Sequence, residues 1–510
     1  MKLVNAGQMK DLEQKTITEY GIDGLLLMEN AARGFCDVLE AEWGSVSGKS
    51  VAVFCGKGGN GGDGFAISRH LSNRGATVTV VFSEAPECLP TDARTNFNTI
   101  HRMGLPILTF SNIKNSAYDI AVDALLGIGF HGTVADKTAD CIEKLNHCAQ
   151  KIASVDVPSG ADCSTGAVTG SCVRADLTVT FALPKPGHYL YPAKEFCGKV
   201  VVSDISVPKQ EIANFPATMF TLDEESVEPL PKRKDNSHKG SFGKVLVFAG
   251  STGMSGACMM TTAAVLKSGA GMVTAAVPDT IADSITARFP EAMTLPLPTR
   301  EGNLTDAADT MIMEKLKNQT VLLAGCGLGT HEKTQKALLS VLSQWEKPMV
   351  IDADGINGLA GHIHIVKNKP VPPILTPHPL EFSRICGLSM EEIQNNRMQI
   401  AGEFAAQNNV VLVLKGADTI VAHPNGRLYI ATQSNSGLAK AGSGDVLAGI
   451  IAALLAQGLS PGSAANLGVY IHSQAGLLAK TRYGAYSMTA GDVINALPDA
   501  FCELARATQE

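Results

Sequence analysis

The residues best suited to chemistry lie in Gly442–Gly449, which reads Gly-Ser-Gly-Asp-Val-Leu-Ala-Gly. Two glycines precede Asp445, and the apolar residues after it recur at helical spacing. We therefore expect Asp445 in the first turn of a buried helix, where glycines and free N–H groups form an anion site. An acid fits there if it removes a proton from a hydroxyl that attacks phosphorus. The alternative is a carboxylate that only complements the helix dipole, and the local sequence leaves both interpretations open.

A second group of polar residues follows three predicted strands in the N-terminal half. The glycine-rich segment Asn60–Gly64 offers N–H groups to an anion, and Asp123 and Ser159 stand at later strand ends. Asn60, Asp123 and Ser159 could converge on a cation through oxygen ligands, which leaves Asp156 as a candidate acid or base. The alternative is that the two aspartates only cap loops.

Four further candidates lie in the C-terminal half. His378 stands between two prolines at a strand end, which favours a ligand contact over a core position. Lys415 follows the apolar run Val410–Leu414 and is either a phosphate partner or a solvated lysine. Asp352 and Asp354 either place Mg²⁺ indirectly or hold a loop.

The elements that must position the N-terminal residues follow a strand–glycine loop–helix–strand order. This order predicts a parallel sheet whose strand ends collect the ligand site. The expected helices are Asn5–Tyr20, Leu25–Trp43 and Phe65–Arg74, and the expected strands are Ser50–Cys55, Thr77–Phe82, Asp119–Asp123, Ile152–Val157, Leu177–Phe181 and Lys199–Ser203.

A change of composition between Val207 and Lys239, with four prolines and short charged patches, predicts a domain boundary near residue 225. The expected domains are therefore 1–224 and 225–510. The second repeats the α/β alternation without repeating the sequence. Its expected helix is Gly256–Gly269, and its expected strands are Lys244–Ala249, Met272–Val277, Thr320–Ala324, Pro348–Asp352, Ile374–Thr376 and Val410–Leu414.

Bulk properties limit the class of protein. A chain of 510 residues exceeds what one hydrophobic core usually supports. The formal net charge of −7, with no basic block, argues against nucleic acid as the main partner. The N-terminus lacks a signal-peptide core, and the apolar run Val446–Ala456 is too short to span a bilayer. The short apolar run predicts a protein without a membrane partner. The twelve cysteines form no Cys-x-x-Cys pair, which predicts reduced, mainly buried thiols in a cytoplasmic protein.

The N-terminal motifs, in this order, resemble the NAD(P)H-hydrate epimerase family over residues 1–220. The resemblance implies a Rossmann-like fold and interconversion of the R and S forms of NADHX and NADPHX, the hydrated reduced nicotinamide cofactors. It implies K⁺ held by Asn60, Asp123 and Ser159, and a hydrated ring bound by Asp156, which we expect to act as the acid/base. The implied substrate contacts are Gly59, Asn60, Gly61, Gly62, Asp63, Gly127, Ile128, Gly129, Phe130, His131, Gly132, Thr133 and Asp156.

The C-terminal motifs resemble the ADP-dependent NAD(P)H-hydrate dehydratase family, a branch of the ribokinase-like superfamily, over about residues 230–505. The motifs are His238-Lys239-Gly240, Thr376-Pro377-His378-Pro379, Lys415-Gly416-Ala417 and Gly442-Ser443-Gly444-Asp445. Leu380-Glu381 departs from the Gly-Glu of many members. The resemblance implies ADP as co-substrate, Mg²⁺ in this domain, and AMP and phosphate as products. It implies that Ala257, Gly327, His378 and Asp445 contact the hydrate, and that Lys415, Gly416, Ala417, Asp418, Thr419 and Gly444 contact the nucleotide.

Three functions are weighed on these grounds. The first is a bifunctional repair enzyme whose epimerase supplies the S hydrate to an ADP-dependent dehydratase. The second is a ribokinase-like kinase for a vitamin alcohol such as hydroxyethylthiazole, which leaves the N-terminal domain without a role. The third is a nucleotide sensor, which has no need of Asp445 or Asp156. The first is favoured, with an α/β fold of two mainly parallel domains and, from the family, a homo-oligomer.

Overall fold

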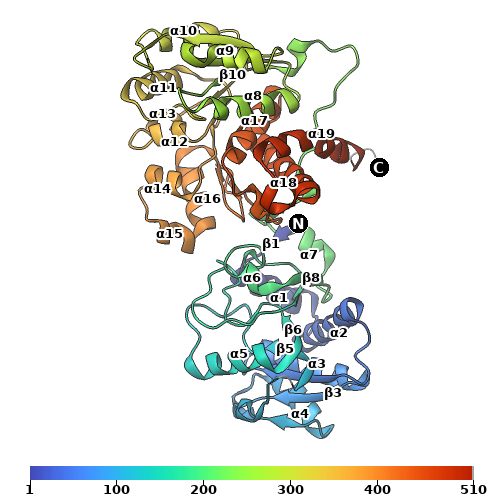
Figure 1. Ribbon diagram of the computed structural model, residues 1–510. Coiled ribbons are helices and arrows are strands. Elements are labelled where there is room, and N and C mark those ends of the chain that lie inside the picture. Colours follow the sequence, from blue (N-terminus) through green and yellow to red (C-terminus); the bar gives the residue numbers. More distant parts are fainter. Residues whose placement is uncertain (116, 508–510) are drawn as a thin grey trace. The chain divides into compact units, whose positions relative to one another are not determined.

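A computed structural model describes residues 1–115 and 117–507 (Figure 1). The chain divides into two compact units, Lys2–Met219 and Phe220–Glu510, with Met1 grouped with the second. Strands and helices alternate in both units, and most strand pairs are parallel, which confirms the predicted α/β class. The division lies slightly before the boundary expected at residues 224/225.

The N-terminal unit is built on a seven-stranded sheet of order β4-β3-β2-β5-β6-β7-β8, parallel throughout. The seven strands of this sheet are β2 (Ser50–Cys55), β3 (Thr77–Val81), β4 (Ile107–Leu108), β5 (Tyr118–Ala124), β6 (Ala149–Val155), β7 (Leu177–Phe181) and β8 (Lys199–Ser203). The short strand β1 (Lys2–Leu3) precedes them in the chain and is not part of this sheet. Its helices are α1 (Ala6–Tyr20), α2 (Gly24–Trp43), α3 (Gly59–Asn73), α4 (Thr91–Arg102), α5 (Asp136–Cys148), α6 (Lys194–Cys197) and α7 (Lys209–Asn214).

Both faces of this sheet are covered, which explains why β2 is apolar along its whole length. Val51 and Val53 belong to a core that includes residues of α2 and α3. Ala52 and Phe54, which point to the other face, pack in a second core with Leu145 of α5. Because the strands are parallel, their carboxyl ends all lie at one edge of the sheet, where the loops after β2, β5 and β6 meet.

The C-terminal unit contains a sheet with the order β20-β19-β18-β17-β16-β15-β10-β11-β12. Pairing is parallel from β12 to β18 and antiparallel from β18 to β20. Its strands are β10 (Lys244–Phe248), β11 (Met272–Pro278), β12 (Met293–Leu297), β13 (Thr299–Arg300), β14 (Asn303–Leu304), β15 (Val321–Ala324), β16 (Met349–Ile351), β17 (Ile374–Leu375), β18 (Val411–Leu414), β19 (Ile420–Ala422) and β20 (Leu428–Ala431), and β9 (Met219–Leu222) lies at the boundary.

Helices α8, α17, α18 and α19 of this unit pack together. The helices are α8 (Ser255–Lys267), α9 (Asp279–Arg288), α10 (Ala308–Leu316), α11 (Glu332–Gln344), α12 (Asp354–Gly358), α13 (His364–Lys367), α14 (Pro379–Cys386), α15 (Met390–Asn395), α16 (Arg397–Asn408), α17 (Ser443–Ala456), α18 (Pro461–Ser487) and α19 (Ala490–Ala507). Helix α17 also packs against β15, so Val446–Leu455 is buried on every side. The expectation of a buried helix that begins near Asp445 is therefore confirmed.

The cysteines and the lengths of the apolar helices can be read from the fold. All twelve cysteines are free thiols, as predicted. Across residues 1–115 and 117–507, we find no helix with the length and apolar character needed to span a membrane.

Candidate active sites

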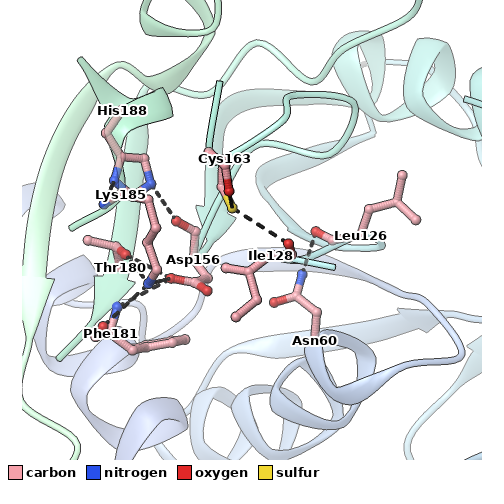
Figure 2. A network of polar contacts seen from close by, with 10 residues as sticks. Asn60, Leu126, Ile128, Asp156, Cys163, Thr180, Phe181, Lys185 and His188 are labelled. Carbon is pink, nitrogen blue, oxygen red and sulfur yellow. Dashed lines mark hydrogen bonds and ion pairs between the residues drawn. The ribbon is translucent and has the colours of Figure 1, made fainter. Parts of the chain in front are cut away.

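Asp156 follows β6 directly and stands at the carboxyl edge of the N-terminal sheet (Figure 2). Its φ of 65° lies in the left-handed region, which is unfavourable for residues other than glycine and is often found at functional sites. The residue is only 8% exposed, and its backbone N–H donates to the Val179 carbonyl at 2.8 Å. The fold thus holds a buried carboxylate in a strained position at the ligand edge of the sheet.

A lysine that the sequence reading did not identify pairs with this carboxylate. Lys185 Nζ donates to Asp156 Oδ1 at 2.5 Å and to Thr180 Oγ1 at 2.9 Å, and Thr180 Oγ1 donates to the same carboxylate oxygen at 2.7 Å. Figure 2 shows these side chains converging. Burial alone would raise the pKa of Asp156, but Lys185 beside it holds that pKa below its ordinary value. Asp156 is therefore an ionised base at neutral pH.

The three predicted cation ligands lie around one loop. Ser159 Oγ donates to Asp123 Oδ1 at 2.5 Å and accepts the Leu126 N–H at 2.8 Å. Asn60 Nδ2 donates to the Leu126 carbonyl at 2.9 Å, so its Oδ1 stays available as a ligand. The structure therefore brings together the oxygen atoms of Asn60, Asp123 and Ser159.

Asp123 itself supplies the test of whether a cation fits. The residue is fully buried, and it accepts from hydroxyl and backbone groups of Ser154, Ser159 and Leu125, none of them charged. Burial raises the pKa of this carboxyl above its ordinary value. A buried carboxylate that lacks a cationic partner among these contacts is an oxygen donor suited to a metal ion. The donor set fits K⁺.

Some glycines of the segment Gly59–Gly64 are needed for close packing, and others border free space. α3 begins at Gly59, so Asn60 and Asp63 lie inside its first turns and not in a loop before a helix at residue 65, which corrects the expected start. A Cβ on Gly61 would lie 1.8 Å from the Gly56 carbonyl, so this glycine is needed for close packing. A Cβ on Gly59 would meet nothing within 4 Å, which leaves space for a ligand. Gly127 lies against Asn60, whereas His131 is exposed and pairs with Asp162.

In the C-terminal unit, Asp445 lies in the first turn of α17, as predicted. Gly442 caps this helix with φ 93°, a backbone conformation that glycine adopts readily. Ligand atoms of Cys326, Asp352 and Asp445 lie within 4.8 Å of one another. Burial raises the pKa of Asp445 to about 7, and the nearby charge of Asp352 adds to the effect. A raised carboxyl pKa is what a general base operating near neutral pH requires.

Lys415 lies next to this group and not in solvent. Its Nζ donates to Asp352 Oδ1 at 2.7 Å and lies 3.9 Å from Glu381 Oε2. A Cβ on Gly444 would come within 3.1 Å of Lys415 Nζ, so the lysine faces the start of α17. A cation and free helix N–H groups thus converge at one place, which suits a phosphate.

His378 has a structural role that the sequence reading missed. It is the N-cap of α14, where its Nδ1 accepts the Glu381 N–H at 3.2 Å and Glu381 accepts the His378 N–H at 2.8 Å. The sequence carries only half of the usual capping-box signature, the Glu three positions after the cap, because histidine is not a common N-cap residue. The His378 side chain is 47% exposed, so it can also contact a ligand.

The remaining predicted contacts fall into two groups. A Cβ on Gly327 would lie 2.7 Å from the Ala257 Cβ, so these two residues are adjacent. Ser251 donates to the Gly327 carbonyl at 2.8 Å, and a cavity of ≈ 180 Å³ opens beside this loop. Asp418, in contrast, pairs with Arg397 at 3.3 Å, which gives its carboxylate a protein partner of its own.

Comparisons with known proteins agree with both halves of the chain. Residues 245–499 match the family model described as NAD(P)H-hydrate dehydratase, and residues 24–187 match that of the YjeF-related protein N-terminus. A bifunctional NAD(P)H-hydrate repair enzyme of Moorella thermoacetica is 40% identical, over 98% of this chain and 96% of that protein. The chain belongs to the bifunctional NAD(P)H-hydrate repair enzymes. It combines an NAD(P)H-hydrate epimerase and a dehydratase in one polypeptide, which confirms the function inferred from its motifs.

Other relatives of this repair enzyme give the same result. The Escherichia coli bifunctional NAD(P)H-hydrate repair enzyme is 35% identical over 87% of this chain and 84% of that protein. A ribokinase-like superfamily protein of Enterococcus faecalis matches 56% of this chain and 97% of its own, at 29% identity and a TM-score of 0.50. The predicted ribokinase-like fold of the dehydratase domain is confirmed.

The carboxylates of the repair enzyme that we expected near Mg²⁺ are engaged with protein groups. Asp352 Oδ1 accepts from Lys415 and from Thr376 Oγ1 at 2.8 Å. Asp354 Oδ2 accepts the Gly329 N–H at 2.8 Å, so Asp354 holds a loop. Asp352 keeps its Oδ2 beside Cys326 and Asp445, so the indirect placement of Mg²⁺ by this residue stays a prediction, and we derive no step through that ion.

Proposed function

We propose that the dehydratase unit transfers a phosphoryl group from ADP to the ring hydroxyl of the S hydrate, and that the epimerase unit converts the R hydrate into S. The observation that supports this proposal best is the position of Asp445, at the N-terminus of α17 beside Lys415. A carboxylate inside an anion site has a use if it deprotonates the attacking hydroxyl. We also infer a cytoplasmic homo-oligomer.

The phosphoryl transfer explains how water is removed. Asp445 takes the hydroxyl proton, and the oxygen forms a bond to the β-phosphorus of ADP as AMP leaves. The N–H groups of Gly442–Gly444 and the Lys415 ammonium stabilise charge on the transferred group. The ring nitrogen's electron pair then expels phosphate, which is a better leaving group than hydroxide, and loss of a ring proton gives NAD(P)H.

Incubation of the purified full chain with NADHX and either nucleotide tests the proposed reaction. Recovery of reduced-nicotinamide absorbance with ADP, accompanied by one AMP and one phosphate per NADH, is the expected outcome. Recovery with ATP alone would overturn the choice of donor. No recovery with either nucleotide would overturn the reaction.

The titration of Asp445 predicts the pH dependence of dehydration. Its pKa is raised to about 7, and only the ionised form accepts a proton, so kcat/KM should fall about tenfold per unit as pH drops below about 7. The measurement is the initial rate with ADP across neutral pH, with the epimerase rate of the same chain as reference. A dehydration rate that stays constant down to about pH 5.5 would contradict the role of Asp445.

For the epimerase unit, Asn60, Asp123 and Ser159 would hold K⁺, and the bound ion would supply positive charge for substrate phosphates. Asp156 is the proposed acid/base of this unit. It exchanges a proton with the hydroxyl or water at the ring carbon as the carbon–oxygen bond is broken and remade from the other face. No bond to the protein is formed in this sequence.

The cation site predicts that K⁺ stabilises the chain. Saturating K⁺ should raise stability relative to tetramethylammonium, by about 2.7 kcal/mol at a concentration a hundred times Kd. The melting temperature at equal ionic strength is the measurement. In Ser159→Ala, the K⁺ concentration needed for the same rise in melting temperature should be about ten times higher. Ser154→Ala, which also removes a hydroxyl donor to Asp123, should keep it. Identical melting temperatures of the wild type in both salts would remove the site.

A further inference from the structure

Lys185 is a buried cation that the reaction described above does not use. It lies in the loop after β7 and is 0% exposed, which is rare for lysine unless it is paired. Its ammonium contacts three acceptors: Asp156 Oδ1 at 2.5 Å, Thr180 Oγ1 at 2.9 Å and the Phe181 carbonyl at 3.4 Å (Figure 2). With three N–H bonds and three protein acceptors, Lys185 has no proton to offer a substrate, so any effect on catalysis passes through Asp156.

The two oxygens of the Asp156 carboxylate are treated differently. Oδ1 accepts from Lys185, from Thr180 at 2.7 Å and from the Phe181 N–H at 3.4 Å. Oδ2 accepts from no donor in residues 1–115 and 117–507. The network therefore saturates one oxygen and leaves the other for a ligand. The Asp156 side chain keeps 12% of its surface exposed, which permits that contact.

The same loop also fixes the Asp156 backbone. His188 Nε2 donates to the Asp156 carbonyl at 2.9 Å, while its Nδ1 accepts the Lys185 N–H at 3.1 Å. Because Nδ1 accepts, the ring proton is on Nε2. Burial lowers the pKa of His188 to about 4, so the ring stays neutral. One loop thus holds both the left-handed backbone and the carboxylate of Asp156.

Two other carboxyl groups feel the charge of Asp156, and their pKa values shift the other way. Burial raises the pKa of Glu13, on α1, to about 7, and the charge of Asp156 adds to the effect. Burial also raises the pKa of Asp63, on α3, and Asp156 again contributes. Of these three carboxyls, Asp156 is the one whose pKa is held below its ordinary value, and it is the one that contacts Lys185. The titratable or charged groups around Asp156 are Lys185, His188, Glu13, Asp63, Lys10 and Cys163.

We propose that Lys185 is a positioning residue for epimerisation, which keeps Asp156 ionised and presents its Oδ2 to the hydrated ring. This inference rests on the proposed role of Asp156. In it, a proton from solvent goes to the departing hydroxyl, which leaves as water while the nitrogen's electron pair forms the C=N bond. Water then adds to the other face and gives its proton to Asp156 Oδ2. Asp156 then returns that proton to solvent, so the site ends in its starting state.

The test is the pH profile of epimerisation in Lys185→Met, measured on the full chain by following the R and S hydrates. Without the ammonium, Asp156 must protonate at higher pH, so the acid limb of kcat/KM should move toward neutral pH and the maximum should fall about a hundredfold. Lys185→Arg should return the limb toward its wild-type position. Lys199→Met, which removes an exposed lysine paired with Glu42, should leave the profile unchanged.

The far-UV circular dichroism spectrum and the melting temperature of each variant report whether the N-terminal unit is folded. If Lys185→Met failed to fold this unit, Thr180→Val would replace it. That variant removes one donor to Oδ1 and should move the limb in the same direction by a smaller amount. An acid limb that stays at its wild-type position, whatever the loss of rate, would overturn the role of Lys185. Full epimerisation by Asp156→Asn would instead overturn the proposed base.

Discussion

Asp445→Asn should abolish dehydration while the same chain continues to epimerise its substrate. The amide keeps the size of the side chain at the start of α17 but cannot take a proton from the ring hydroxyl. General-base catalysis contributes roughly 10²–10⁴-fold, so the loss in kcat should be of that order. Recovery of NADH with ADP measures dehydration, and separation of the R and S hydrates measures epimerisation.

A matched variant separates this role from a helix-dipole effect. Asp309 also stands in the first turn of a helix, α10. Asp309→Asn removes a comparable favourable charge, worth about 0.3–1 kcal/mol of stability, and should leave dehydration unchanged. Equal losses of dehydration in both variants would show that the charge of Asp445 acts through the helix. Equal loss of both reactions in a folded Asp445→Asn protein would show that the two sites are not independent.

Asp156→Asn should have the reciprocal effect. Asparagine tolerates the left-handed backbone at this position and keeps most of its hydrogen bonds, so the chain should fold. It cannot act as the base, so epimerisation should fall roughly 10²–10⁴-fold, while dehydration of purified S hydrate stays at the wild-type rate. Rates with separated R and S hydrates are the measurement.

The control for this variant is Asp119→Asn. Asp119 lies on β5 and accepts from Ser50, so the variant changes a carboxylate of the same unit outside the site. It should epimerise normally. An Asp156→Asn protein that epimerises as fast as this control would remove Asp156 from the mechanism.

Much of the fold follows from local pattern. Strand Ser50–Cys55 was predicted with its observed bounds because a buried parallel strand reads as an unbroken apolar run. Asp445 was placed correctly because glycines and an apolar repeat mark the start of a helix. The early start of α3 was missed, since Gly59–Gly64 has poor helix propensity and its helical form depends on close packing against Gly56.

The site was harder to predict than the fold, because its charge pairs join distant segments. Nothing local to Lys185 shows that its ammonium is buried against Asp156, and a lysine between prolines reads as a surface loop. The pairing of Lys415 with Asp352 was missed for the same reason. The capping role of His378 has only a partial signal in the sequence, Glu381 three positions later, because histidine is not a common N-cap residue.

Complementation of the two variants tests the central claim, that one chain carries two independent sites acting in succession. An equimolar mixture of R and S hydrates is incubated with excess ADP, and NADH is followed to completion. Asp156→Asn alone should stop near half of the total, and Asp445→Asn alone should give almost none. An equimolar mixture of the two variants should recover all of it. Failure of the mixture to exceed Asp156→Asn alone, with both proteins folded, would contradict the account.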